Sequence, residues 1–212
     1  MSGIVQVGGK TLASHNTGTD VISWGTGVPA GTVLQVSTQF FGEAFTQDMV
    51  GGTPEAINGG VTRNSTADWN VLITPSAASA GLSTNFICTF CFGRMAAHNT
   101  STGHGLGLTL ERTTATVSTD IGISTHGSNL PKCTWFAGTN HHTYRTGLSL
   151  SFVDTVVVPS TPVAIMYKVK GHAHAGGTYT TCWNRGPAVG TDADEGYLAV
   201  TGSTWTVTEV VG

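Results

Sequence analysis

Charged side chains are scarce in this sequence. Asp, Glu, Lys and Arg make up 10% of the 212 residues, against roughly 25% in an ordinary soluble domain. The net charge is −3, whereas a nucleic-acid-binding surface needs clustered Lys and Arg. We therefore expect no nucleic-acid partner. A polar, uncharged coat suits a protein that buries its surface in symmetric or particle contacts, because each buried Lys or Glu would cost desolvation energy.

Long apolar runs are also absent. No stretch of about 18 apolar residues occurs, so we expect no membrane insertion. The first residues, Met1–Val7, do not combine a basic stretch with the longer apolar stretch that a secretory signal requires. The sequence therefore predicts synthesis in a cytoplasm.

The four cysteines do not form a recognisable disulfide or zinc pattern. Cys88 and Cys91 have CxxC spacing, but they lie in an apolar stretch that has the character of a buried strand. Residues three apart on a strand point to opposite faces, so the two thiols diverge and no second CxxC follows. We favour core packing for this pair over a metal site or a disulfide.

Motifs that carry catalysis are missing as well. No GxSxG elbow occurs, and the glycine-rich stretch 103–107 lacks both GxGxxG spacing and a βαβ setting. The acidic stretch 191–196 offers three carboxylates without the spacing of a calcium loop, which favours a solvated turn. The sparse Asp and Glu give no obvious pair for glycoside hydrolysis. We therefore predict a protein that is not an enzyme and has no cofactor.

What the sequence does contain is a series of short β-strands. β-Branched and aromatic residues stand in alternating runs, separated by Gly, Asn, Ser or Pro. The predicted strands are Thr32–Phe41, Asn70–Thr74, Thr84–Phe92, Leu106–Arg112, Thr114–Ile123, Lys132–Phe136, Leu148–Val153, Val163–Lys170, Thr178–Asn184, Tyr197–Thr201 and Thr204–Val210. Residues 42–50 could hold one helical turn or a further strand.

Many short strands without alternating helices predict an all-β fold, an antiparallel β-sandwich or jelly roll. We expect one such module over residues 31–212. Residues 1–30 are interrupted by glycines, and we expect them to form an irregular N-terminal arm for attachment to a particle.

Two histidines suggest a metal site. His172 and His174 follow the predicted strand Val163–Lys170, and in an extended chain their imidazoles would share one face about 6 to 7 Å apart. One pair offers too few ligands, but in a homotrimer with this strand near the axis six imidazoles could hold a transition metal. Solvent-facing or hydrogen-bonded histidines in a turn are the favoured alternative.

Four stretches resemble, in this order, a β-rich module of tailed-bacteriophage virion proteins, often described as tail fibre or structural proteins. They are Gly31–Val36, Ile73–Ser76 with the following Ala78-Ser79, Leu148–Asp154 with Val163–Lys170, and Trp205–Gly212. The resemblance spans residues 31–212. It implies a virion component on the particle surface, a homotrimer that also contacts other phage tail or capsid proteins.

Three functions are compatible with that resemblance. The first is a short tail fibre or appendage that contacts a host glycan or protein through loop aromatics, which anchor interfaces at little entropic cost; the candidates are Trp135, Phe136, Tyr144, Trp183 and Tyr197. For most of these aromatics, core packing is the favoured alternative. The second is a capsid decoration protein that stabilises the head, and the third is a polysaccharide depolymerase.

Overall fold

A computed structural model describes residues 3–7, 10–16, 21–24, 29–51, 53–57, 69–98, 105–115, 117–123, 133–138, 146–173, 178–184 and 201–212. Within these ranges the chain is almost entirely β-structure, with one short 3₁₀ turn, η1 (Ala77–Ser79), and no α-helix. None of the described residues form a helix that could cross a membrane.

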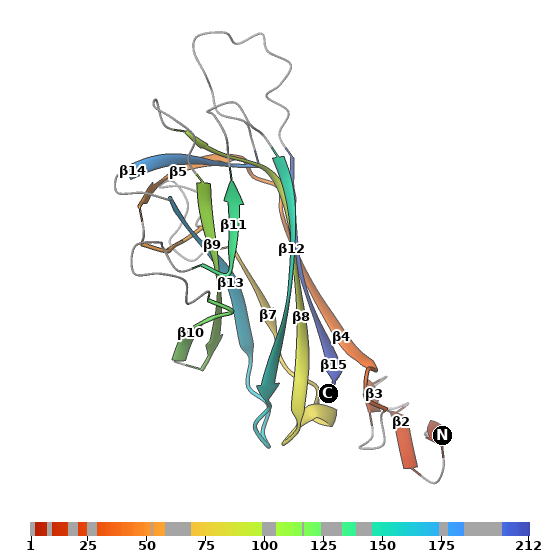
Figure 1. Cartoon of the computed structure of the whole chain (residues 1–212). Helices are drawn as coiled ribbons and strands as arrows, with labels where there is room; N and C mark the ends of the chain where they lie inside the picture. The colour runs from red at the N-terminus through yellow and green to blue at the C-terminus, as the bar shows by residue number, and fades with distance from the viewer. Residues whose placement is uncertain are drawn as a thin grey trace.

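Two six-stranded antiparallel sheets build the body of the protein (Figure 1). Sheet I consists of β4 (Val33–Phe41), β5 (Phe45–Val50), β8 (Ser83–His98), β12 (Thr146–Val157), β14 (Thr178–Trp183) and β15 (Ser203–Val211). Sheet II consists of β6 (Glu55–Ala56), β7 (Asn70–Ile73), β9 (Gly105–Thr114), β10 (Val117–Ile121), β11 (Trp135–Gly138) and β13 (Ile165–Ala173). The prediction of an all-β antiparallel sandwich is confirmed.

The period-two alternation of the strands explains why the two sheets stack. On β8, Phe86 and Phe90 are fully buried, while Ile87 and Thr89 between them are half-buried on the other face. β9 of sheet II contributes Leu108 and Leu110 to the same core. Each sheet thus has one apolar face, and burying both faces against each other removes them from water.

Aromatic rings fill the centre of the core. Trp205 of β15 is fully buried, and its ring centroid lies 5.1 Å from that of Phe90 and 5.7 Å from that of Trp69. Both pairs meet edge to face, which is a preferred arrangement of aromatic quadrupoles. The bulk of these rings fills the space between the two sheets.

A buried carboxylate fixes the turn η1 against β15. Glu209 is fully buried and accepts hydrogen bonds from the Ser76 backbone N–H at 2.9 Å, from the Ser79 hydroxyl and from Gln35 Nε2 at 2.5 Å. These donors satisfy a charge that would otherwise be costly to bury. The carboxylate therefore holds the connection between β7 and β8 to the closing strand.

The long strand β8 organises sheet I. One edge of β8 pairs with β12, and the other edge pairs with β15 over residues 84–91 and with β14 over residues 95–98. Because β15 pairs in turn with β4, the four strands β12, β8, β15 and β4 lie side by side as one broad surface (Figure 1).

The N-terminal residues carry more regular structure than the sequence predicts. Instead of an irregular stretch, β1 (Gly3–Val7), β2 (Lys10–Asn16) and β3 (Val21–Trp24) pair into a three-stranded antiparallel sheet. This sheet lies beyond one end of the sandwich, beside η1 (Figure 1). The described residues of this segment are therefore paired strands, and the expectation of an irregular segment was wrong for them. Attachment to a particle stays a prediction.

Most of the predicted strands are present with shifted ends. β8 is 16 residues long because its continuation after Phe92 still pairs with β14. The ambiguous residues 42–50 hold a strand, β5. The predicted strand Tyr197–Thr201 lies outside the described residues except for Thr201.

Candidate functional site

The outer face of sheet II carries a cluster of four charged side chains, here called the ionic cluster: Glu111, Asp120, Lys168 and Lys170. In the sheet register Asp120 lies opposite Glu111, and Glu111 lies opposite Lys168. Cross-strand pairs on one face have adjacent Cβ atoms. The three strands β10, β9 and β13 therefore bring together charges that are far apart in the sequence.

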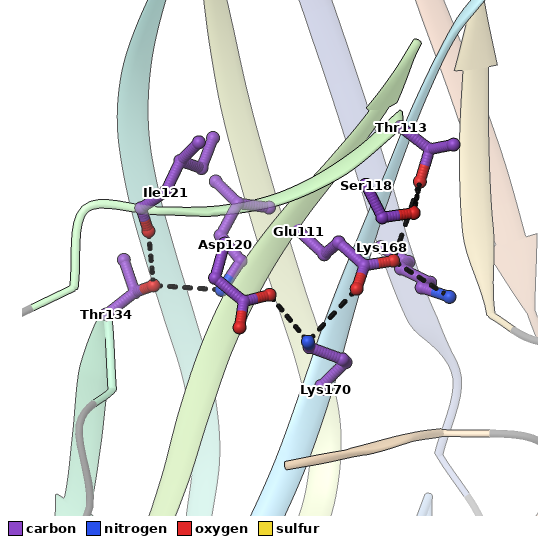
Figure 2. Close-up of polar contacts among 9 residues, drawn as sticks. Glu111, Thr113, Ser118, Asp120, Ile121, Thr134, Lys168 and Lys170 are labelled. Atoms are coloured by element: carbon purple, nitrogen blue, oxygen red, sulfur yellow. Dashed lines mark hydrogen bonds and ion pairs between the residues drawn. The ribbon is translucent and has the colours of Figure 1, made fainter. Parts of the chain in front are cut away.

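The two lysines bridge the two carboxylates (Figure 2). Lys168 Nζ lies 2.9 Å from Glu111 Oε1, and Lys170 Nζ lies 3.0 Å from Glu111 Oε2. Lys170 Nζ also lies 2.5 Å from Asp120 Oδ1. The cluster is neutral as a whole, with two positive and two negative charges, so it exerts little net field on an approaching ion.

The surroundings of Glu111 hold it in the charged form. Burial alone raises the pKa of this carboxyl, but hydrogen bonds from Lys168 and Lys170 together with their charges outweigh burial, and the net pKa is lowered. For Lys170, burial acts to lower the pKa, while hydrogen bonds and charges from Asp120 and Glu111 leave it raised. A general acid in glycoside hydrolysis needs a raised carboxyl pKa, so Glu111 is set up for ion pairing.

Thr134 links strands β10 and β9 at the edge of this face. Its hydroxyl donates to the Ile121 carbonyl at 2.8 Å and accepts from the Leu110 backbone N–H at 2.8 Å (Figure 2). β10 ends and β11 begins on the same edge of β9, and the threonine bridges that gap. Thr134 thus ties the end of β10, next to Asp120, to β9.

A second charged group lies between the sheets. Arg112 Nη1 lies 2.9 Å from both oxygens of Asp154, and the Tyr167 hydroxyl donates to the same carboxylate at 2.8 Å. Burial and the negative charge of Asp154 raise the pKa of Tyr167, and the same two causes raise the pKa of Cys88. Neither group ionises near neutral pH, so this interior cluster stabilises the stacking of the sheets and offers no activated nucleophile.

The structure does not support the predicted histidine cage. His172 is buried with 1% of its surface exposed, and it lies against Gly107 on the neighbouring strand β9. A buried ring inside one chain cannot reach an ion shared between three chains, so the expectation was wrong for His172. His174 lies outside the described residues, within which no three His, Cys, Asp or Glu residues come together as a metal site.

The predicted surface aromatics divide into two groups. Trp183 is fully buried in the core and Trp135 is half-buried against it; the Trp135 ring lies 6.0 Å from Phe90. Surface binding was therefore the wrong interpretation for Trp183, because its ring fills the space between the sheets. Tyr144 and Tyr197, like the acidic stretch 191–196, lie outside the described residues, and the side chain of Phe136 is not described.

The CxxC pair behaves as the strand alternation predicts. Cys88 is buried in the core and Cys91 is exposed on the opposite face, and both are free thiols. The Cys91 sulfur lies 3.5 Å from the Ser149 hydroxyl. The two cysteines do not converge on a common ligand.

A feature that sequence reasoning missed is an extended surface without charge, here called the uncharged face. It is the outer face of β4, β15, β8 and β12, and its members are Val36, Thr38, Phe40, Thr204, Thr206, Thr208, Ile87, Thr89, Cys91, Ser149, Ser151, Val153, Thr155 and Val157. None of these side chains is an Asp, Glu, Lys, Arg or His. The alternating threonines of Thr204–Thr208 were the available signal, since alternate residues on a strand share a face.

The uncharged face is organised in rows across the strands. One row is formed entirely of hydroxyls, from Thr38 through Thr206 and Thr89 to Ser151; the first two oxygens lie 3.1 Å apart. The face also exposes large apolar groups, because Phe40 is 64% and Val157 is 73% exposed. Such a mixed apolar and hydroxyl surface is suited to protein contact.

Comparisons with known proteins give no family. No family model matches the chain, and no curated protein matches it. Among solved structures, the chain is similar to the CBM22-1 and GH10 modules of the Clostridium thermocellum endo-1,4-β-D-xylanase 10B in complex with xylohexaose, with 10% identity and a TM-score of 0.26. That alignment covers 86% of this chain and 28% of the xylanase chain. A TM-score this low does not establish a common fold.

Proposed function

We propose that this chain is a non-enzymatic structural protein of a bacteriophage particle, displayed on the surface as a short tail fibre or appendage module. Its work is contact, with sister copies and particle proteins on one side and with the host on another. The assignment to a phage particle is supported by the resemblance of residues 31–212 to phage virion modules.

The uncharged face is the observation that carries the contact role. Its side chains bring no charge that would need desolvation on burial, and Val36, Phe40, Val153 and Val157 are each more than half exposed. By contrast, the ionic cluster and the Asp154–Arg112–Tyr167 group use their charges in internal pairs. The charges of these two groups stabilise the fold. The uncharged face is therefore the surface that favours a contact role.

Locating the chain on purified particles tests the proposal. Gold-labelled antibody against the chain, viewed by electron microscopy, should mark the tail or its tip. Label on the capsid faces would instead identify a head decoration protein, and absence of label from particles would refute a virion role.

A competition assay tests host contact separately. Purified chain at saturating concentration should block adsorption of the phage to its host, because free copies would occupy the receptor. Unchanged adsorption would contradict the tail appendage. Release of sugars from host polysaccharide by the purified chain would contradict the non-enzymatic role.

A further inference from the structure

We propose that the uncharged face of sheet I is the surface on which another copy of this chain packs. The occupant is a second copy with the same face turned toward the first, so that equivalent residues meet near a symmetry axis. This inference does not depend on a phage origin, and it assigns the self-association surface to four strands: β4, β15, β8 and β12.

The first argument is electrostatic. In a symmetric contact a residue near the axis meets its own equivalent, so any charge there would face a like charge. The chain has 9 basic and 12 acidic residues, yet none lies in the three rows of outward residues that cross all four strands. These rows are Val36–Thr208–Ile87–Val153, Thr38–Thr206–Thr89–Ser151 and Phe40–Thr204–Cys91–Ser149. The ion pairs of Glu111 and Asp120 with Lys168 and Lys170 lie on the outer face of sheet II, and the Arg112–Asp154 pair lies between the sheets. The exposed Asp48 of sheet I lies on β5, outside the four strands of the uncharged face.

The second argument comes from the exposed apolar groups. Val36 of β4 is 58% exposed and Val153 of β12 is 54% exposed, and the two lie at opposite ends of one row, joined by Thr208 and Ile87. Phe40 and Val157 add larger exposed surfaces of 64% and 73%. A second copy would remove these groups from water, and buried apolar area stabilises association.

The third argument is size. Four strands about 4.8 Å apart and about nine residues long, at roughly 3.3 Å per residue, give a face of roughly 20 by 30 Å. Its projected area of about 600 Å² understates the accessible surface of side chains standing on a pleated sheet. A specific interface buries about 800 Å² per partner, so one such face is large enough for a stable contact between copies.

The fourth argument is that the polar members of the face suit self-contact. The row Thr38, Thr206, Thr89 and Ser151 consists of hydroxyls. A hydroxyl can donate and accept, so it can pair with an identical hydroxyl from a sister chain. Lysines or carboxylates in the same row could not pair with their own equivalents.

Sedimentation velocity of the full chain tests the proposal, with a charge introduced on the β12 strand of the face. The wild type should sediment as an oligomer, and Val153→Lys should weaken association by about ten-fold or more, because the contact would bury an ammonium group that has no carboxylate on the face to pair with. The matched control is Val117→Lys on β10 of sheet II, where the valine is 62% exposed; this variant should associate as the wild type does.

Cys91 gives an independent measurement that does not depend on the substitution being tolerated. It is exposed on the uncharged face of the single chain, so a maleimide reagent should modify it slowly in concentrated protein and rapidly after dilution. Mass spectrometry of peptides distinguishes Cys91 from the other three cysteines. Val153→Lys should remove the protection at the same concentration.

Three outcomes would overturn the inference. A wild type that stays monomeric at all concentrations would leave the face for a different partner, such as another particle protein or a glycan. An oligomer that Val153→Lys leaves intact, or in which Cys91 remains fully reactive, would place the contact elsewhere. None of these outcomes bears on where the chain lies on the particle. The proposed function is tested separately, by locating the chain on purified particles.

Discussion

Gly107 shows how one missing methyl group shapes the outer face of sheet II. A Cβ at this position would lie 2.2 Å from both Cε1 and Nε2 of His172, far inside van der Waals contact. The imidazole is buried and cannot swing into solvent. The glycine is therefore needed so that the histidine ring can lie across the neighbouring strand.

We expect Gly107→Ala to lower the free energy of unfolding by about 1 to 3 kcal/mol, the usual cost of overpacking a tight site. Urea denaturation followed by tryptophan fluorescence measures the change. Gly147→Ala on β12 is the control, because its added Cβ would approach the Phe92 carbonyl oxygen at an ordinary 3.6 Å. Equal stability of the two variants would contradict the close packing of His172.

The paired carboxyl group of Glu111 predicts how the stability of the fold depends on pH. The pKa of this carboxyl is lowered in the folded chain by Lys168 and Lys170, so the unfolded chain binds more protons at acid pH. The contribution of the Glu111 carboxylate to the free energy of unfolding is complete above the unfolded pKa of about 4.3. It is lost as pH falls through the lowered pKa of the folded chain. We expect the stability difference between wild type and Glu111→Gln to be about 1 to 2 kcal/mol at pH 7, between the values for exposed and buried pairs.

That difference should shrink steadily below about pH 4, as measured by urea denaturation at a series of pH values. A difference that stays constant down to the acid unfolding of the protein would show that the glutamine acts through packing and not through the lost charge. Lys170 keeps Asp120 as a partner in this variant, so the fold should survive.

At the scale of elements, β12 is the strand that joins the two layers. Its outward residues belong to the uncharged face, while inward-pointing Asp154 reaches Arg112 of β9 and Tyr167 of β13. The strand therefore couples sheet I to sheet II through a charge, in addition to the apolar core. Buried polar groups of this kind are costly to break because the remaining partner is left without its counter-charge.

We expect Asp154→Asn to destabilise the chain by about 3 kcal/mol, at the low end for a buried pair because Arg112 reaches solvent on one side. Thermal unfolding followed by circular dichroism measures the loss. Asp48→Asn on β5 is the control, since Asp48 is exposed and accepts a hydrogen bond from Thr180 at the surface; it should change stability by about 0.5 kcal/mol or less. Similar losses of stability in both variants would contradict the inference that Asp154 stabilises the stacking of the two sheets through its charge.

At the scale of the whole molecule, charge is distributed unevenly between the two outer faces. Sheet II carries a neutral network of paired charges, whereas the uncharged face of sheet I carries apolar groups and hydroxyls. Salt screens interactions between exposed charges but leaves apolar contacts nearly untouched. The salt dependence of association therefore reports which face is used.

We expect the self-association constant to change by less than about two-fold when salt is raised from about 0.05 M to about 0.5 M. Val153→Lys supplies the comparison, because salt should screen the repulsion between introduced lysines and partly restore association. Sedimentation equilibrium at both concentrations measures the two constants. A wild-type oligomer that dissociates in salt would assign the contact to charged surfaces instead.

Local patterns were sufficient to predict the strands, but not which face of a strand is buried. Alternation places Cys182 and Trp183 on opposite faces of β14, and each is an apolar side chain that could face the core. Both are in fact buried, so neither side of β14 is open to solvent at these two positions. His172 was misjudged for the same reason, since nothing in its own strand indicates that a glycine on β9 makes room for the ring.

The sequence by itself determined that this protein is an all-β sandwich of short antiparallel strands, because strand formation depends on the period and composition of neighbouring residues. The tertiary structure decided which surfaces are left for contact. The uncharged face combines residues from β4, β8, β12 and β15 that are up to about 170 positions apart in the chain. A surface of that kind exists only after strands pair, because pairing and register, and not sequence proximity, bring its side chains together.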